Sequence, residues 1–313
     1  VIDLAAKEIT LERATTRKVK RAMPAKGLKA APPAKYTAIS PFTRLAAGQY
    51  EATLTAGTKP ESFILVPKAR NAVFPEIKVT VVADTATIQA TKPTPNTQTP
   101  QLANGNSPIE VKTLLKDANG NPIINSVVTW SSNKDPQKVI FTPVSSTTDN
   151  NGYATTLIAS TLAGEVTITA TPTNGSPQDV TLTFIPDATT SVLKPQNINI
   201  TQNGSIADGK KPNLVSITIT DQFGNPLPNV DVQFATDKGT LANTLVKTDA
   251  NGVAQTAITS TQAGEANVTI TVDGKDIQHK VQFVGDKSTP QIAKPTVSQI
   301  TQIADGKKPI EIT

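Results

Sequence analysis

Apolar and polar residues alternate along several short segments in the C-terminal half of the chain. The apolar members of these segments are Val215, Ile217, Ile219, Val230, Val232, Phe234, Ala266, Val268, Ile270, Val272, Val281 and Phe283. Successive side chains of a β-strand point to opposite faces, so a period of two predicts strands with one buried face. Clusters of Asn, Asp, Gly and Pro separate the segments and predict turns at hairpin-like distances.

The same arrangement occurs once more, earlier in the chain. Its inward positions are Val111, Thr113, Leu115, Val128, Trp130, Val166, Ile168, Ala170, Leu182 and Phe184. The motif D-x-x-G-N-P begins at Asp117 and again at Asp221, 104 residues later, and the glycines of S-T-x-A-G-E, Gly164 and Gly264, are 100 residues apart. A repeat of about 100 residues is the size of a domain and is too long for a solenoid repeat.

Each repeat holds about seven short strands and no helical period, which is typical of an immunoglobulin-like β-sandwich. We therefore predict an all-β chain of tandem immunoglobulin-like β-sandwich domains in an extended rod. The expected domains are 1–84, a partial or divergent domain with a basic N-terminal stretch; 85–187 and 188–286, two complete sandwiches; and 287–313, the first strands of a further truncated domain. The motif A-D-G-K-K-P, which opens the repeat at 207–212, recurs at 304–309.

One large aromatic residue occupies the same slot in both complete repeats. Trp130 and Phe234 are 104 residues apart and lie on equivalent alternating segments. Buried aromatic side chains dominate the energetics of protein cores. We interpret this slot as the centre of each core, in preference to a site that stacks a ligand.

The N-terminal region departs from the repeat. Residues 1–47 lack the D-x-x-G-N-P turn and hold ten basic and three acidic residues, a balance of +7, whereas the rest of the chain carries −2. Residues 5–21 are expected to form a short helix. The basic run 16–21 has no interleaved aromatic residues for stacking on bases, so a solvated charged face is favoured over a nucleic-acid or lipid contact.

Composition excludes several kinds of chemistry. The chain has no Cys, so no thiolate can act as a nucleophile or metal ligand, and it has a single His in 313 residues, which argues against a catalytic triad in each domain. No run of about 20 apolar residues is present that would span a membrane as a helix. Without a signal peptide or an initiator Met, the sequence is expected to be an interior piece of a longer chain.

Two acidic patterns invite comparison with metal sites. The segment D-A-N-G-N-P at 117–122 places Asp and Asn at alternate positions, but an EF-hand needs Gly at position six and Glu at position twelve, where this chain has Pro122 and Val128. A turn between strands is the favoured interpretation. Each repeat ends in an aspartate: Asp84, Asp187 or Asp286. These residues are interpreted either as calcium ligands or as part of a solvated turn or cap at the domain boundary. Calcium takes six to eight oxygen ligands, and the one or two acidic residues at each junction fall short of that number.

His279 stands where other copies have Val180 and Ile77 and is interpreted as a residue at the rim of a strand. General acid–base catalysis needs a partnered group in a pocket. We nominate no catalytic, cofactor-binding or metal-binding residue, expect no cofactor, and expect that the protein is not an enzyme.

As an ensemble, the motifs A-D-G-K-K-P, D-x-x-G-N-P, D-A-N-G-V-A and S-T-x-A-G-E resemble the bacterial Ig-like group 1 domains of the intimin/invasin family of inverse autotransporter adhesins. The similarity covers residues 85–286, with partial matches on either side. It implies a stalk segment on the bacterial cell surface, extracellular and anchored to the outer membrane through a region outside this sequence. It also implies neighbouring Ig-like domains as partners, and a host cell-surface receptor bound by other parts of the protein, without nucleic acid and without a membrane span in this segment.

Two functions are therefore weighed: a structural spacer that projects a distal binding tip, and an Ig-like module that itself binds host glycoprotein or polysaccharide. A binding module needs exposed aromatic residues on loops, and Tyr36, Phe42, Tyr153 and Phe223 are the candidates. Phe223 replaces Asn119 in the repeated turn, and we expect it to pack against a neighbouring domain.

Overall fold

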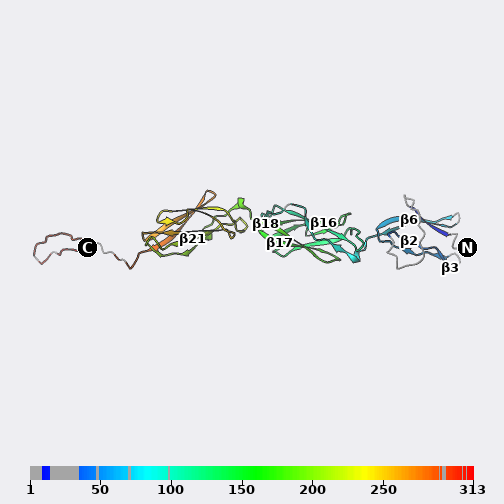
Figure 1. The fold of residues 1–313 in the computed structure, drawn as a ribbon, viewed down its shortest axis with the longest axis horizontal. Coiled ribbons are helices and arrows are strands. Elements are labelled where there is room, and N and C mark those ends of the chain that lie inside the picture. The colour runs from blue at the N-terminus through cyan, green and yellow to red at the C-terminus, as the bar shows by residue number, and fades with distance from the viewer. Residues whose placement is uncertain are drawn as a thin grey trace. The chain divides into compact units, whose positions relative to one another are not determined.

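The computed structural model describes residues 9–14, 35–46, 49–69, 72–97, 99–288, 290, 294–304, 306–307 and 309–313. The chain divides into two compact units, Val1–Ile185 and Pro186–Thr313. Strands make up nearly all of the regular structure in both units (Figure 1). Each unit contains one complete two-sheet sandwich, called here the first and the second sandwich, and this confirms the predicted all-β fold.

The N-terminal part of the first unit is built around one sheet. Its strands are β1 (Ile9–Ala14), β6 (Glu61–Ala69), β7 (Ala72–Val73) and β8 (Ile77–Val81). Between β1 and β6 in the sequence, the chain forms two small two-stranded sheets: β2 (Ala38–Ile39) with β5 (Leu54–Thr55), and β3 (Thr43–Ala46) with β4 (Gln49–Glu51). The β6 residues Phe63 and Leu65 are buried and give this sheet its apolar face.

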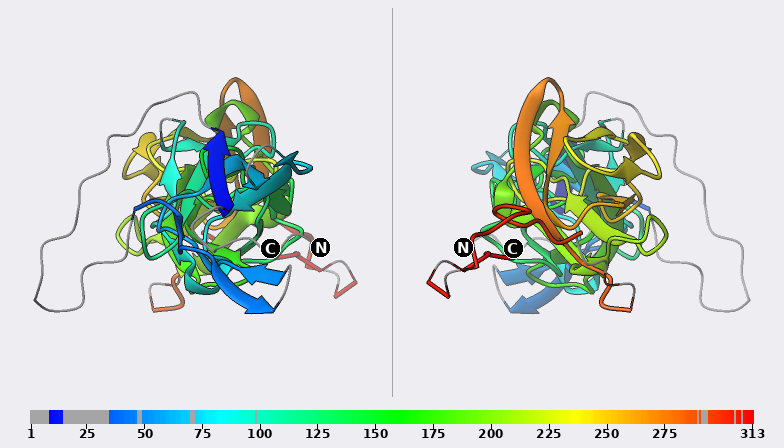
Figure 2. Two further views of the ribbon diagram at one scale, coloured as in Figure 1. Left: turned by 90° about the vertical axis from the view of Figure 1, so that its right-hand side faces the viewer. Right: turned by 90° about the vertical axis from the view of Figure 1, so that its left-hand side faces the viewer.

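The helix expected over residues 5–21 is wrong where the structure describes this segment. Residues 9–14 form strand β1, dark blue in Figure 2, which pairs antiparallel with β6 from Ile9 opposite Ala69 to Ala14 opposite Ile64. Backbone pairing with a strand far along the chain outweighs the local helical propensity of the segment. Residues 5–8 and 15–21 lie outside the described residues, and so does the basic run 16–21.

The first sandwich follows a short 3-10 turn, η2 (Thr85–Thr87). One sheet has the order β10 (Thr94–Pro95), β12 (Ile109–Lys116), β16 (Tyr153–Ser160), β14 (Val139–Thr142), and β9 (Gln89–Ala90) also pairs with β12. The other has the order β11 (Gln101–Leu102), β18 (Gln178–Ile185), β17 (Gly164–Pro172), β13 (Val127–Ser132), β15 (Ser145–Thr147). The inward faces of both sheets are the alternating residues that the sequence predicted.

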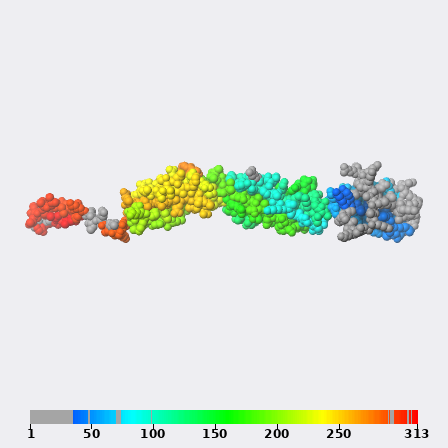
Figure 3. Space-filling model, viewed as in Figure 1, coloured from blue at the N-terminus to red at the C-terminus, as the bar shows by residue number. Residues whose placement is uncertain are grey.

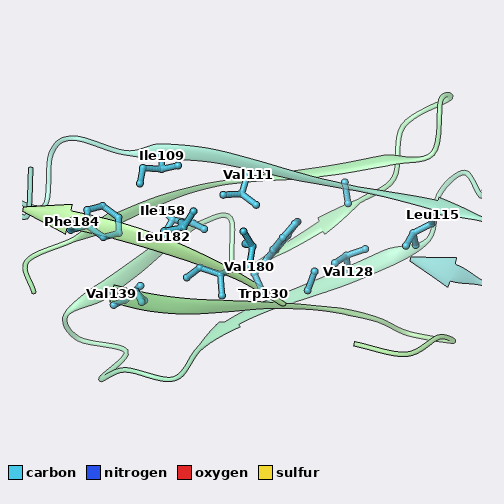
Figure 4. Packing of buried hydrophobic residues seen from close by; sticks show 14 of the residues in the cluster. Ile109, Val111, Leu115, Val128, Trp130, Val139, Ile158, Val180, Leu182 and Phe184 are labelled. Carbon is cyan, nitrogen blue, oxygen red and sulfur yellow. The ribbon is translucent and has the colours of Figure 1, made fainter. Parts of the chain in front are cut away.

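The core of the first sandwich lies between these sheets and is centred on Trp130. Its side chain is 1% exposed, and its indole Nε1 donates a hydrogen bond to Ser146 Oγ at 2.9 Å. Side chains close over this core on the face shown in Figure 3, and Figure 4 shows Val128, Val180 and Leu182 around the indole. The interpretation of Trp130 as a core residue is confirmed.

The second sandwich repeats this plan after the 3-10 turns η3 (Ala188–Thr190) and η4 (Pro195–Asn197). Its sheets have the orders β19 (Ile198–Gln202), β21 (Asn213–Thr218), β25 (Val253–Thr259), β23 (Thr240–Leu241), and β20 (Ser205–Ile206), β27 (Lys275–Val284), β26 (Gly264–Val272), β22 (Asp231–Thr236), β24 (Leu245–Lys247). Phe234 is 1% exposed at the position equivalent to Trp130. Beyond this sandwich, Val297 forms an isolated antiparallel bridge with Ile312.

A glycine in the D-A-N-G turn allows a close backbone approach. Gly252 has φ +72°, and a Cβ on it would lie 2.4 Å from the carbonyl oxygen of Ile219. We expect Gly252→Ala to destabilise the second sandwich by about 3 kcal/mol, since the left-handed backbone and the steric clash both act. Gly274→Ala is the matched control, because Gly274 has φ +74° and no atom within 4 Å of its Cβ position. Urea unfolding of both variants separates the cost of the left-handed backbone, which they share, from the cost of the steric clash, which only Gly252→Ala has. Equal losses of unfolding free energy in the two variants would contradict the close approach at Gly252.

Candidate functional site

Each sandwich is preceded by an aspartate that caps a 3-10 turn. Asp84 Oδ1 accepts a hydrogen bond from the Ala86 amide at 2.9 Å, and Asp84 Oδ2 accepts one from Thr87 Oγ1 at 3.1 Å. Asp187 Oδ1 accepts from the amide and the hydroxyl of Thr189, at 3.1 and 2.7 Å. Of the two interpretations offered for these aspartates, the cap at the domain boundary is therefore the one that the structure shows.

The aspartate of the D-x-x-G-N-P turn binds the linker to the sandwich. Asp117 is 2% exposed. Its Oδ1 accepts hydrogen bonds from the amides of Asn119 and Asn121, both at 2.9 Å. Its Oδ2 accepts from Asn121 Nδ2 at 2.8 Å and from the Asp84 amide at 3.2 Å. One buried carboxylate thus fixes both its own turn and the last residue of the preceding segment.

Hydrogen bonding keeps this carboxylate charged. Burial acts to raise the pKa of Asp117, but the side-chain bond from Asn121 and the backbone bonds from Asn121, Asp84 and Asn119 together outweigh it and hold the pKa below its usual value. A carboxylate that accepts several N–H bonds is stabilised in its ionised form. The site is therefore a fixed negative charge whose hydrogen bonds hold structure in place.

The same turn also reaches back to the N-terminal part of the first unit. Asn121 Nδ2 donates a second hydrogen bond, at 2.7 Å, to the carbonyl oxygen of Thr58, and Asn121 is itself 8% exposed. The Ala118 amide donates to Thr87 Oγ1 of the linker at 3.2 Å. The Asn121 amide therefore joins three parts of this unit: the loop at Thr58, the linker-bound Asp117 and its own turn.

The second sandwich contains the same network. Asp221, 1% exposed, accepts from the amides of Phe223 and Asn225 at 2.9 Å and from Asn225 Nδ2 at 2.8 Å. Its Oδ2 also accepts from the Asp187 amide at 3.2 Å. Linker and turn aspartates are separated by 33 residues in the first case and 34 in the second. The network is therefore a feature that the two sandwich domains share.

We call the linker aspartate, the turn aspartate and the turn asparagine together the boundary network: Asp84, Asp117 and Asn121 in the first unit, and Asp187, Asp221 and Asn225 in the second. The sequence pattern predicted the turn but not the burial of Asp117 or Asn121, nor their bonds to the linker. The signal that could have found it is the similar spacing between the two aspartates, 33 residues in the first copy and 34 in the second. Asp286 accepts from the Ser288 amide at 2.8 Å, so the third boundary begins with a similar cap.

The other residues singled out in the sequence lie apart from this network. His279 is half-buried on β27, opposite Val268 of β26, as expected for a residue at the strand rim. Tyr36 and Tyr153 are exposed, and Lys35 and Lys112 ammonium groups lie 5.8 and 5.3 Å from the centres of their rings. Phe42 and Phe223 are half-buried, and the packing of Phe223 on a neighbouring domain stays a prediction.

Among the residues that the structure describes, the domain boundaries hold no cluster of possible metal ligands. No group of three or more His, Cys, Asp or Glu side chains is close enough there to hold a metal ion. The carboxylates of Asp84 and Asp187 accept hydrogen bonds from the turns that they cap. What the arrangement can do chemically is to hold the backbone of the linker against the sandwich that follows.

The boundary network is expected to make stability depend on pH. Because the pKa of Asp117 is lower in the folded state than in the unfolded state, its contribution is fully present above the usual Asp pKa and is lost as the pH falls through the lowered folded pKa. Asp149, Asp208 and Asp237 also have lowered pKa values, so they add to the acid dependence of any variant.

Comparison of the native chain with Asp117→Asn isolates this one carboxylate. The difference in unfolding free energy between the two should be largest at neutral pH and should shrink as the pH is lowered through the acid range. Urea titrations at a series of pH values measure it. A difference that stays constant with pH would show that the charge of Asp117 does not contribute.

Within the part of the chain that the structure describes, no helix is long and apolar enough to cross a membrane. The sequence matches the family model for the bacterial Ig-like domain (group 1) twice, over residues 93–185 and 195–284. These two matches coincide with the sheets of the first and the second sandwich.

The chain is similar to several curated and solved proteins. The chain is 29% identical over 260 residues to the inverse autotransporter adhesin YeeJ of Escherichia coli strain K12, covering 80% of this chain and 11% of YeeJ. It is 27% identical over 167 residues to intimin of Escherichia coli O127:H6, covering 53% of this chain and 17% of intimin. The crystal structure of invasin, described as a bacterial integrin-binding protein, superposes with a TM-score of 0.46 at 16% identity, covering 85% of this chain and 55% of that one.

The chain thus spans less than a fifth of the length of these two curated relatives. The matches confirm the resemblance to the intimin/invasin group that the repeated motifs indicated. The two family matches together cover more than half of the sequence, and the chain belongs to the bacterial Ig-like domain (group 1) family.

Proposed function

We propose that this chain is a non-catalytic stalk segment of a bacterial surface adhesin. The observation that carries the proposal is the boundary network, present in both units with the same three residue types. A linker bonded through one of its backbone amides to a buried carboxylate of the next domain loses much of the freedom of an unattached chain. Stiff boundaries are what a spacer needs, and they contribute nothing to catalysis.

In this proposal the stalk projects a distal binding tip and serves cell adhesion or invasion. The host-cell receptor is bound by other parts of the full protein, and anchoring to the outer membrane is supplied by a region outside this sequence. The neighbouring Ig-like domains are the direct partners of the segment. The homology to YeeJ and intimin, both long proteins of which this chain matches a small part, supports this assignment.

The alternative, in which an Ig-like module itself binds host glycoprotein or polysaccharide, is not favoured. Of the four aromatic candidates, Phe42 and Phe223 are half-buried, and they provide little surface for a ligand. Tyr36 and Tyr153 are exposed but lie on different parts of the first unit and each is accompanied by a lysine. We see no cluster of aromatic side chains among these four.

Small-angle X-ray scattering of the complete chain, with and without a calcium chelator, tests the proposal. We expect an extended scattering profile that the chelator leaves unchanged, because the described boundary carboxylates accept hydrogen bonds from N–H groups. A compact particle would overturn the stalk assignment. An extended particle that bends on chelation would instead place calcium at the boundaries.

A further inference from the structure

One edge of the second sandwich is unpaired along most of its length. Strand β27 pairs with β26 on one side from Lys275 to Phe283. On its other side it pairs with β20 only at Phe283 and Val284. In the order of its sheet only the two-residue strand β20 lies outside β27, and the 3-10 turn η4 lies close to β27. An unpaired edge is a template for another strand.

The hydrogen-bond pattern shows which backbone groups face this open edge. The Gln282 amide donates to Asn203 Oδ1 at 2.8 Å and its carbonyl accepts from the Gly204 amide at 3.0 Å, so the backbone groups of Gln282 point away from β26. Backbone direction alternates along a strand. The N–H and C=O groups of Lys280, Gln278 and Asp276 therefore face the edge as well.

The side chains of these three residues are exposed and form a self-complementary series. Asp276, Gln278 and Lys280 all lie on the solvent face of β27, in the order acid, amide, base. If a second β27 is placed antiparallel with Gln278 opposite Gln278, each Asp276 falls opposite a Lys280. All three positions are then hydrogen-bonded pairs, because their backbone groups face the partner strand.

We propose that the open edge of β27 is a docking surface for a second copy of this chain, paired antiparallel about Gln278. The two-fold arrangement joins the two sheets and sets two Asp276–Lys280 ion pairs across the interface. Opposite charges facing each other across a ladder stabilise the pairing, and like charges oppose it. The inference goes beyond the stalk function, since it concerns lateral association of neighbouring chains.

Contacts within the chain already orient the charged side chains. Lys280 Nζ lies 2.8 Å from Glu265 Oε2, and Asp276 Oδ1 accepts from Thr271 Oγ1 at 2.6 Å. Both partners stand on β26, on the paired side of β27, so each charged side chain exchanges this contact for its partner across the edge when a second strand binds.

The equivalent edge of the first sandwich lacks this complementarity. Its strand β18 pairs with β11 only at Phe184 and Ile185. Asp179 lies opposite Thr169 in the same way that Gln278 lies opposite Thr269. A two-fold ladder about position 179 would set Thr181 opposite Pro177, so it offers no ion pair, and Pro177 has no amide N–H to donate. Self-docking is therefore specific to the second sandwich, and the first provides a matched control.

Cysteine cross-linking of the complete chain tests the proposal, because the protein has no cysteine of its own. Hydrogen-bonded residues of an antiparallel pair have Cα atoms about 5.5 Å apart, which suits a disulfide, so we expect Gln278→Cys to form disulfide-linked dimers at least about five times faster than Asp179→Cys at equal concentration. Thermal melting checks that both variants are folded. Equal rates for the two variants would overturn the proposal.

Charge reversal in the Gln278→Cys background tests the ion pairs separately. Adding Lys280→Asp sets like charges across the interface and should slow dimer formation to the rate of the Asp179→Cys control. Adding Asp276→Lys to that variant restores opposite charges and should restore the rate. If Lys280→Asp has no effect, or if the double reversal fails to restore the rate of a folded protein, the two-fold register about Gln278 is wrong.

Discussion

Trp130→Ala is expected to unfold the first sandwich at a much lower temperature and to leave the second sandwich unchanged. The indole is 1% exposed at the centre of the first core, and it is the largest of the fully buried side chains. Truncation of a buried Trp or Phe to Ala costs about 3–5 kcal/mol. For a domain of this size such a loss lowers the melting temperature by about 15 °C or more.

The effect is expected to be confined to the first sandwich because the two cores share no residues. Every residue of the core around Trp130 comes from the first unit, and every residue of the core around Phe234 comes from the second. Phe234→Ala should therefore give the reciprocal result, with the second sandwich destabilised and the first unchanged. Differential scanning calorimetry of both variants assigns each transition, and Trp130 fluorescence reports the first sandwich alone, since the chain has one Trp.

Trp130→Phe is the matched control because the second sandwich has Phe at this slot. It keeps most of the apolar volume and loses the hydrogen bond to Ser146, so the expected cost is about 1 kcal/mol. If Trp130→Ala lowered both transitions by similar amounts, the two sandwiches would be one cooperative unit, and their treatment as separate domains would be wrong.

The alternation of apolar residues was sufficient to predict the sandwiches, because sheet burial acts on every second side chain. Val215 and Ile217 on β21, and Val166 and Ile168 on β17, are all completely buried as the pattern indicated. The segment around Ile9 could not be predicted as a strand in this way. Its pairing partner, Ala69, is far along the chain, and local propensity says nothing about a strand pair of that separation.

The boundary network is a second feature that local sequence alone does not predict. Asp, Asn, Gly and Pro at 117–122 predict a turn because these residues favour turn backbone geometry. Nothing local distinguishes Asp117, which is buried, from Asp149, which accepts amides of Asn151 and Tyr153 in a similar turn but is exposed. The carboxylate of Asp117 accepts the amide of Asp84 from the linker, whereas the amides bonded to Asp149 come from its own turn.

This contrast leads to the second large effect. Asp117→Ala is expected to destabilise the first sandwich by about 3 kcal/mol, because the amides of Asn119, Asn121 and Asp84 lose their acceptor in a buried position. Asp221→Ala should have an effect of the same size on the second sandwich, where Asp221 is equally buried. Urea unfolding followed by circular dichroism measures both.

Asp149→Ala separates burial from turn chemistry. Asp149 accepts amide hydrogen bonds at 2.8 and 2.9 Å, much like Asp117, but water can replace it as the acceptor. Its substitution should therefore cost much less than that of Asp117. Equal losses would mean that the turn alone matters and that the linker contributes nothing.

Hydrogen exchange at the Asp84 amide completes the argument, because this group donates across the boundary to Asp117. In Asp117→Ala, the Asp84 amide should lose its protection while amides at the centre of β17 keep theirs under conditions where the domain stays folded. In Asp149→Ala, the protection of the Asp84 amide should be unchanged. Protection of Asp84 that survives the loss of Asp117 would show that the linker is held by other contacts, and the case for the boundary network as the source of stiffness would fail.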